Sequence, residues 1–84
     1  MNGILMDKQT AHQLLAGRVT IRRSGTSWVG SIDSDARLLK AIRGTYRVML
    51  TNGSLFDVNV EHVAIAGGTL IDFVGVGSPP KGFM

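Results

Sequence analysis

The sequence predicts a single, mainly β domain that folds as a small closed barrel of about five to six strands. Short runs in which apolar and polar residues alternate are separated by turns rich in glycine, serine and asparagine. Of the 84 residues, 44% are hydrophobic and 18% are charged, which is typical of an ordered globular domain, and no cysteine is present to form disulfides. A closed barrel removes the exposed strand edges that a flat sheet would leave.

Residues 1–17 predict an N-terminal helical segment. Residues 7–16 are good helix formers in which Ala11, Leu14 and Leu15 recur at helical spacing, and Gly17 can end the turn. The apolar run before Asp7 is too short for a signal peptide, which favours a cytoplasmic, reducing compartment. Nowhere do about 18 apolar residues follow one another, so no membrane contact is expected.

Residues 18–76 predict the barrel itself. The period changes to two in residues 18–22 and 28–32, which we expect to form the first hairpin, and two further strands are expected over residues 63–65 and 69–74, around Gly67–Gly68. Residues 61–63 look like a turn. Residues 77–84, with Pro79–Pro80, predict a flexible tail.

Residues 34–44 predict one short helical insert within the barrel. Ser34 can cap the helix, and Gly44 suits the left-handed position that follows its last turn. The expected buried stripe consists of Leu38, Leu39, Ala41 and Ile42.

The Asn52–Gly53 turn allows the strand register to be tested. A two-residue loop would set Val48 opposite Asp57 and mix polar groups into an apolar face. A three-residue loop over residues 51–53, with Gly53 in the left-handed position, keeps both faces consistent. It predicts the pairs Val48–Phe56, Tyr46–Val58, Met49–Leu55 and Arg47–Asp57.

Charge is unevenly distributed along the chain. The formal net charge is +3, but residues 18–47 carry a net +5, while residues 48–80 contain no basic residue and a net −3. A basic surface can face phosphates, can meet the acidic part of a neighbouring subunit, or can simply be solvated. The candidate phosphate-binding residues are Arg22, Arg23, Arg37, Lys40 and Arg43.

Trp28 is the only tryptophan, and three roles are open for it: a core aromatic, an interface anchor or a platform for a nucleic acid base. The hairpin also has apolar residues on both faces, with Met49 and Leu55 on the outside. The candidate interface residues are therefore Trp28, Met49, Leu55, Arg47 and Asp57.

One stretch resembles a known family. The likeness rests on Arg22–Arg23–Ser24–Gly25–Thr26–Ser27–Trp28–Val29–Gly30–Ser31–Ile32, which is similar to the second-strand region of the type II, plasmid-borne dihydrofolate reductases. These are SH3-like barrels that assemble as tetramers around one active-site pore. With short gaps the resemblance covers residues 17–65, and it implies an SH3-like barrel.

The resemblance does not extend to the family's catalytic strand. That strand carries folate and nicotinamide contacts as Val–Gln–Ile–Tyr, whereas the matching place here reads Leu55–Phe56–Asp57–Val58, without the glutamine amide or the tyrosine hydroxyl. His12 and His62 are also isolated from other metal-ligating residues in the sequence. We therefore expect no catalytic residues, no metal and no cofactor.

These observations favour a non-enzymatic binding module. The first hypothesis is a barrel that self-associates or docks on a protein partner, of the kind that phages and mobile elements encode as assembly or inhibitor proteins. It is favoured because so short a chain, without disulfides, often gains burial from a partner subunit. The alternatives are a nucleic-acid-binding protein that uses the basic residues and, last, a reductase of the type II kind.

Overall fold

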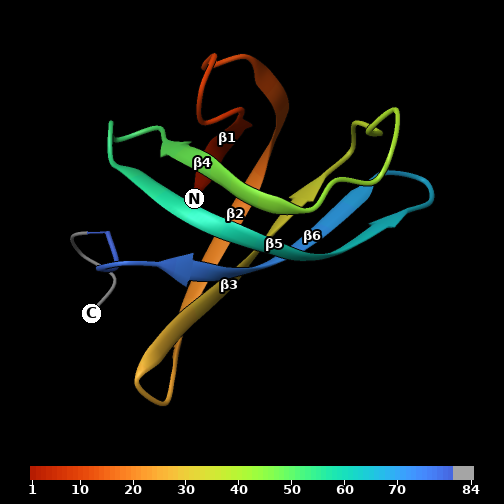
Figure 1. Ribbon diagram of the computed structural model, residues 1–84. Helices are drawn as coiled ribbons and strands as arrows, with labels where there is room; N and C mark the ends of the chain where they lie inside the picture. The colour runs from red at the N-terminus through yellow and green to blue at the C-terminus, as the bar shows by residue number, and fades with distance from the viewer. Residues whose placement is uncertain (81–84) are drawn as a thin grey trace.

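Six antiparallel strands close into a barrel in the computed structural model, which describes residues 1–80 (Figure 1). The order around the barrel is β1-β2-β3-β6-β5-β4, and β4 pairs back with β1. The mainly β barrel expected from the sequence is confirmed. The strands are β1 (Asn2–Met6), β2 (Gln13–Ser24), β3 (Ser27–Ser34), β4 (Gly44–Leu50), β5 (Leu55–Ile65) and β6 (Thr69–Val76).

The barrel consists of two three-stranded meanders. Strands β1, β2 and β3 pair in sequence order, and so do β4, β5 and β6. The halves meet at two seams, where β1 pairs with β4 and β3 pairs with β6. The connection over residues 35–43 leads from one half to the other.

The core is formed by the inward-facing residues of all six strands, and three aromatic rings lie within it. The ring of Phe56 packs edge-on against Trp28 at a centroid distance of 5.4 Å and lies 6.4 Å from the ring of Phe73. Trp28 Nε1 donates to the Gly77 carbonyl oxygen at 2.9 Å, so the buried indole keeps a polar partner. Burial of each large apolar side chain stabilises the fold by about 1.5–3 kcal/mol.

The hairpin between β4 and β5 has the predicted three-residue loop. Val48 pairs with Phe56 and Arg47 pairs with Asp57, as do the other two predicted pairs. Gly53 has a φ of 90° and its N–H donates to the Leu50 carbonyl oxygen at 2.9 Å. The register was predictable because a shift of the pairing by one residue would move the inward-facing apolar side chains to the outer face.

The predicted N-terminal helix over residues 7–16 is wrong, because residues 1–80 contain no helix. The chain makes a single turn after Asp7, and Ala11, at a φ of 61°, lies in the left-handed region that ends it. From Gln13 the chain enters β2, where Leu15 pairs with Leu5 of β1 and both are buried. Packing against the barrel thus overrides the local helix preference.

The predicted helical insert over residues 34–44 is also wrong. Ser34 Oγ does accept from the Ala36 N–H at 3.1 Å, as a cap would. The next backbone groups, however, bond to the buried hydroxyl of Thr69, which donates to the Ala36 carbonyl at 2.8 Å and accepts from the Leu38 N–H at 3.1 Å. These bonds to β6 replace the bonds that a helix would make within itself.

Only part of the expected buried stripe in this connection packs inward. Leu38 and Ile42 are half-buried against the core, while Leu39 is fully exposed and Ala41 is exposed. The left-handed conformation expected of Gly44 is confirmed at a φ of 99°.

Two further predictions concern the second half of the barrel. The turn predicted over residues 61–63 is wrong: β5 is continuous there, with a register shift between Val60 and His62 that marks a bulge. The hairpin around Gly67–Gly68 is confirmed. Of the predicted tail, Pro80 is buried, and residues 81–84 lie outside the described residues.

The close approach of Gly75 to Trp28 predicts a specific weakness. A Cβ atom at residue 75 would overlap the indole ring, so Gly75→Ala forces the core apart and lowers the free energy of unfolding by about 1–3 kcal/mol. Urea denaturation followed by the fluorescence of Trp28 measures this. The matched control is Gly67→Ala, since nothing lies within 4 Å of its added Cβ. Equal stability of the two variants would contradict the described packing.

Candidate protein-interaction surface

Apolar side chains form a continuous row across the outside of four strands. Ile4 of β1 pairs with Ala16 of β2 on one side and with Met49 of β4 on the other, and Met49 pairs with Leu55 of β5. We call these four residues the outer apolar row. Strands lie about 4.8 Å apart, so the row extends over about 14 Å. Leu55 is 56% exposed, although it is a large apolar side chain.

The outer apolar row borders a groove of about 530 Å³. Ile4, Ala16 and Met49 line it together with residues of the neighbouring β4–β5 turn. Contiguous apolar surface that is rimmed by polar residues can mark a protein interaction site. The remaining lining residues are Asn2, Gly3, Gly17, Leu50, Thr51 and Gly53.

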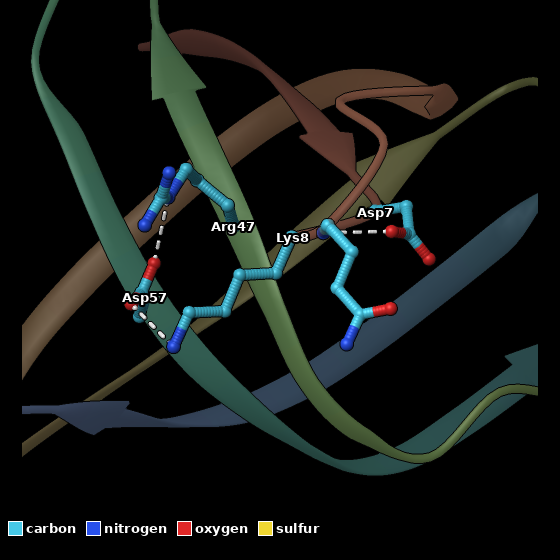
Figure 2. Close-up of polar contacts among 5 residues, drawn as sticks. Asp7, Lys8, Arg47 and Asp57 are labelled. Atoms are coloured by element: carbon cyan, nitrogen blue, oxygen red, sulfur yellow. Dashed lines mark hydrogen bonds and ion pairs between the residues drawn. The ribbon is translucent and has the colours of Figure 1, made fainter.

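A charged cluster flanks the row on the same outer face. Asp57 of β5 receives two cations, each on its own carboxylate oxygen: Arg47 Nε lies 2.9 Å from Oδ1 and Lys8 Nζ lies 3.2 Å from Oδ2. Figure 2 shows the Lys8 side chain crossing over β4 to reach Asp57. The structure therefore brings Arg47, Asp57, Met49 and Leu55, four of the predicted interface residues, together on one face.

The turn after β1 sets the position of Lys8. Asp7 Oδ1 accepts from the N–H groups of Gln9 and Thr10 at 2.8 and 2.9 Å, and the Ala11 N–H donates to the Asp7 carbonyl at 2.9 Å. The backbone bonds from Thr10 and Gln9 lower the pKa of Asp7. The Asp7 carboxylate thus holds the turn after β1 in place, and Lys8 extends from this turn.

The charged cluster perturbs its own titration. The hydrogen bond from Arg47 lowers the pKa of Asp57, and Lys8 adds to this effect against the opposing effect of burial. Asp57 in turn raises the pKa of Arg47. The Asp57 carboxylate already pairs with Arg47 and Lys8 of its own chain, and these two ion pairs hold its side chain in place on the surface.

Trp28 lies apart from the outer apolar row. It is 5% exposed and faces the core, with Phe56 and Gly75 against its indole. Of the three roles that the sequence left open, its position in the described chain is that of a core aromatic.

The five candidate phosphate-binding residues fall into two groups. Arg22 and Arg23 lie near the tip of the β2–β3 hairpin, opposite Val29 and Trp28, while Arg37, Lys40 and Arg43 belong to the connection that follows β3. Trp28 and Ser34 are six residue steps apart along β3, which is about 20 Å of strand. The groups lie at opposite ends of that strand (Figure 1).

The sequence reasoning missed three members of this surface: Ile4, Ala16 and Lys8. All three belong to residues 1–17, which the sequence predicts as a helical segment. No alternation in the sequence identifies them, because Ile4–Leu5–Met6 is a continuous apolar run in which only the structure separates half-buried Ile4 from its buried neighbours. Leu14–Leu15–Ala16 in β2 is a similar run, of which Leu15 alone is buried.

The described residues hold no group of three or more His, Asp or Glu side chains that could bind a metal ion. They also include no helix long and apolar enough to cross a membrane. No family model matches the chain, and neither a curated protein nor a solved structure matches it.

The Asp57 cluster predicts a pH-dependent contribution to stability. Because the hydrogen bond from Arg47 holds the folded-state pKa of Asp57 below the 3.8 of a free aspartate, the ionised carboxylate stabilises the fold above that pH. The contribution is lost as the pH falls through the lowered pKa. Asp57→Asn therefore lowers the urea midpoint at pH 7, and the difference from the unmodified chain shrinks below about pH 4.

Asp72→Asn is the matched control, since it removes the same charge from an exposed position on the neighbouring strand β6. We expect it to leave the midpoint at pH 7 nearly unchanged. A loss for Asp57→Asn that is equally large at pH 3 and pH 7 would exclude the electrostatic explanation.

Proposed function

We propose that the chain is a non-enzymatic small barrel that acts by association, through the outer apolar row. The single observation that carries the proposal is the register that aligns Ala16, Ile4, Met49 and Leu55 across four strands. Self-association is the form we favour, and docking on a different protein is the broader one. Classification as an SH3-like barrel and a cytoplasmic location belong to the same proposal. The closed antiparallel architecture is compatible with the former.

The charged cluster supports a role in orientation. Partly exposed ion pairs contribute little to stability, but charges beside an apolar contact steer association and fix its register. Arg47 and Lys8 side chains are 38% and 45% exposed, so both keep surface for a partner while they hold Asp57.

Reductase chemistry finds little support in these residues. At the position of the family's ligand-binding strand, Phe56 and Val58 face the core, and Asp57 is held by Arg47 and Lys8. Neither an amide nor a phenol is offered there to folate or nicotinamide.

We predict that the chain is an oligomer and that Leu55→Glu dissociates it. A glutamate at residue 55 places a charge in the apolar contact, which is costly once water is excluded. The measurement is light-scattering mass at micromolar concentration. The matched control is Leu70→Glu, because Leu70 is also an exposed leucine, 41% exposed on β6, away from the row. It should remain associated.

A mass near the 9.0 kDa of one chain, unchanged by salt, would overturn self-association. Equal dissociation by Leu55→Glu and Leu70→Glu would show that association does not depend on the row.

Nucleic acid binding is the second candidate function, favoured by exposed Arg22 and Arg23 near the hairpin tip. Because the basic residues form two separated groups, we expect no sub-micromolar binding to random-sequence DNA at about physiological salt. The measurement is fluorescence anisotropy over a series of salt concentrations.

Binding with a log–log salt slope steeper than about −2 would support the nucleic acid candidate instead. Replacing Arg22 and Arg23 by alanine should then reduce the slope by up to about two units, with Arg37→Ala plus Lys40→Ala as the matched pair at the other end of β3.

A further inference from the structure

The outer half of β2 has a neighbouring strand on one side only. The pairing of β1 with β2 ends at the Asn2–Arg18 pair, whereas β3 continues to pair with β2 as far as Ser24. The β2–β3 hairpin consequently projects from the barrel (Figure 1). Beyond Val19, one edge of β2 faces no strand of the described chain, although the barrel itself is closed.

Backbone polar groups point out of this edge. The Val19 N–H donates to the Met1 carbonyl oxygen at 2.6 Å, and the Met1 nitrogen donates back to the Val19 carbonyl at 3.3 Å, so Val19 faces the β1 side. Bonding direction alternates along an antiparallel strand. Ile21 therefore presents its N–H and C=O to the same side, beyond the N-terminal end of β1.

The positive charge of β2 limits which kind of strand can pair with its free edge. β2 contains Arg18, Arg22 and Arg23 and no acidic residue. Antiparallel pairing of two copies about Ile21 would place their Arg22 side chains at diagonal positions about 7–8 Å apart, where like charges repel. An acidic strand is attracted by the same residues.

We propose that this edge of β2 binds an extended acidic protein segment, which adds to the sheet as an antiparallel strand in line with β1. Its backbone bonds to the N–H and C=O of Ile21, and its alternate acidic side chains lie opposite Thr20 and Arg22 on the outer face, the first of them diagonal to Arg18, which faces Asn2. The site lies outside the outer apolar row and goes beyond the association proposed for it. It can be tested whether or not the chain self-associates.

The probe is a nine-residue synthetic peptide in which glutamate alternates with threonine and valine. Two matched peptides carry lysine in place of glutamate, or N-methyl groups on the backbone amides that face β2. NMR titration gives each dissociation constant, and hydrogen exchange follows the Ile21 amide. We expect the acidic peptide to protect the Ile21 N–H, and both matched peptides to bind about tenfold more weakly or worse.

Variants of the chain isolate the backbone contribution. Ile21→Pro removes the N–H that points out of the edge and leaves the bonds between β2 and β3, since proline is tolerated on an edge strand. We expect about tenfold weaker binding of the acidic peptide, with Ile21→Val unchanged. Arg22→Gln should weaken binding less, and its effect should disappear at high salt. Should Ile21→Pro fail to fold, hydrogen exchange of the Ile21 amide in the unmodified chain, with and without the acidic peptide, tests the backbone contact.

Several results would overturn the proposal. Equal binding of the lysine or N-methylated peptide would show that no acidic strand is added, as would an Ile21 amide that stays unprotected. Displacement of the peptide by an equal concentration of single-stranded DNA would identify the edge as a nucleic acid site. Loss of binding in Leu55→Glu would place the peptide on the outer apolar row instead.

Discussion

Strand β1 is the constraint on which the rest of the structure depends. Its residues pair on both sides, with β2 and with β4, and this double pairing turns five strands into a closed barrel. Leu5 is fully buried, so the strand also contributes to the core. Without β1, both β2 and β4 would expose long edges, which natural proteins avoid. Ile4, on the other face of the same strand, joins Ala16 to Met49.

The hairpin between β4 and β5 was predictable because two independent requirements agreed there. The apolar face needed Val48 opposite Phe56, and the polar face needed Arg47 opposite Asp57. Gly53 supplied the left-handed residue that the resulting loop requires. Where faces and turn chemistry give the same register, one sequence is sufficient to define it.

The two predicted helices failed for a common physical reason. Leu15 and Leu38 have local surroundings that favour helix, but other strands of the barrel set their environment: Leu5 of β1 pairs with Leu15, and Thr69 of β6 binds the backbone at Leu38. Propensity is a small energy per residue, and barrel closure outweighs it. Thr69 and Leu38 are 31 residues apart, so no local pattern carries a signature of their contact.

Residues of the candidate site could be predicted from the sequence only where the strands that carry them could be predicted. Arg47, Met49, Leu55 and Asp57 follow from the hairpin register, whereas Lys8 and Ile4 depend on β1 and the turn after it. The sequence has a basic segment over residues 18–47, but its candidate phosphate-binding residues do not form one patch on the surface. Arg22 and Arg37 are near each other in the sequence, but β3 lies between them, and its length keeps the two side chains apart.

The two-meander architecture has a consequence for how the chain could exchange parts with a copy of itself. Residues 35–43 link the two halves, and fully extended they reach about 30 Å, which compares with dimensions of 32 × 25 × 22 Å for the molecule. That length lets both seams close within one chain. If the connection were too short to return β4 to β1, each half would find its seams in a second chain. The length of an irregular loop therefore decides between a self-contained barrel and a domain-swapped pair.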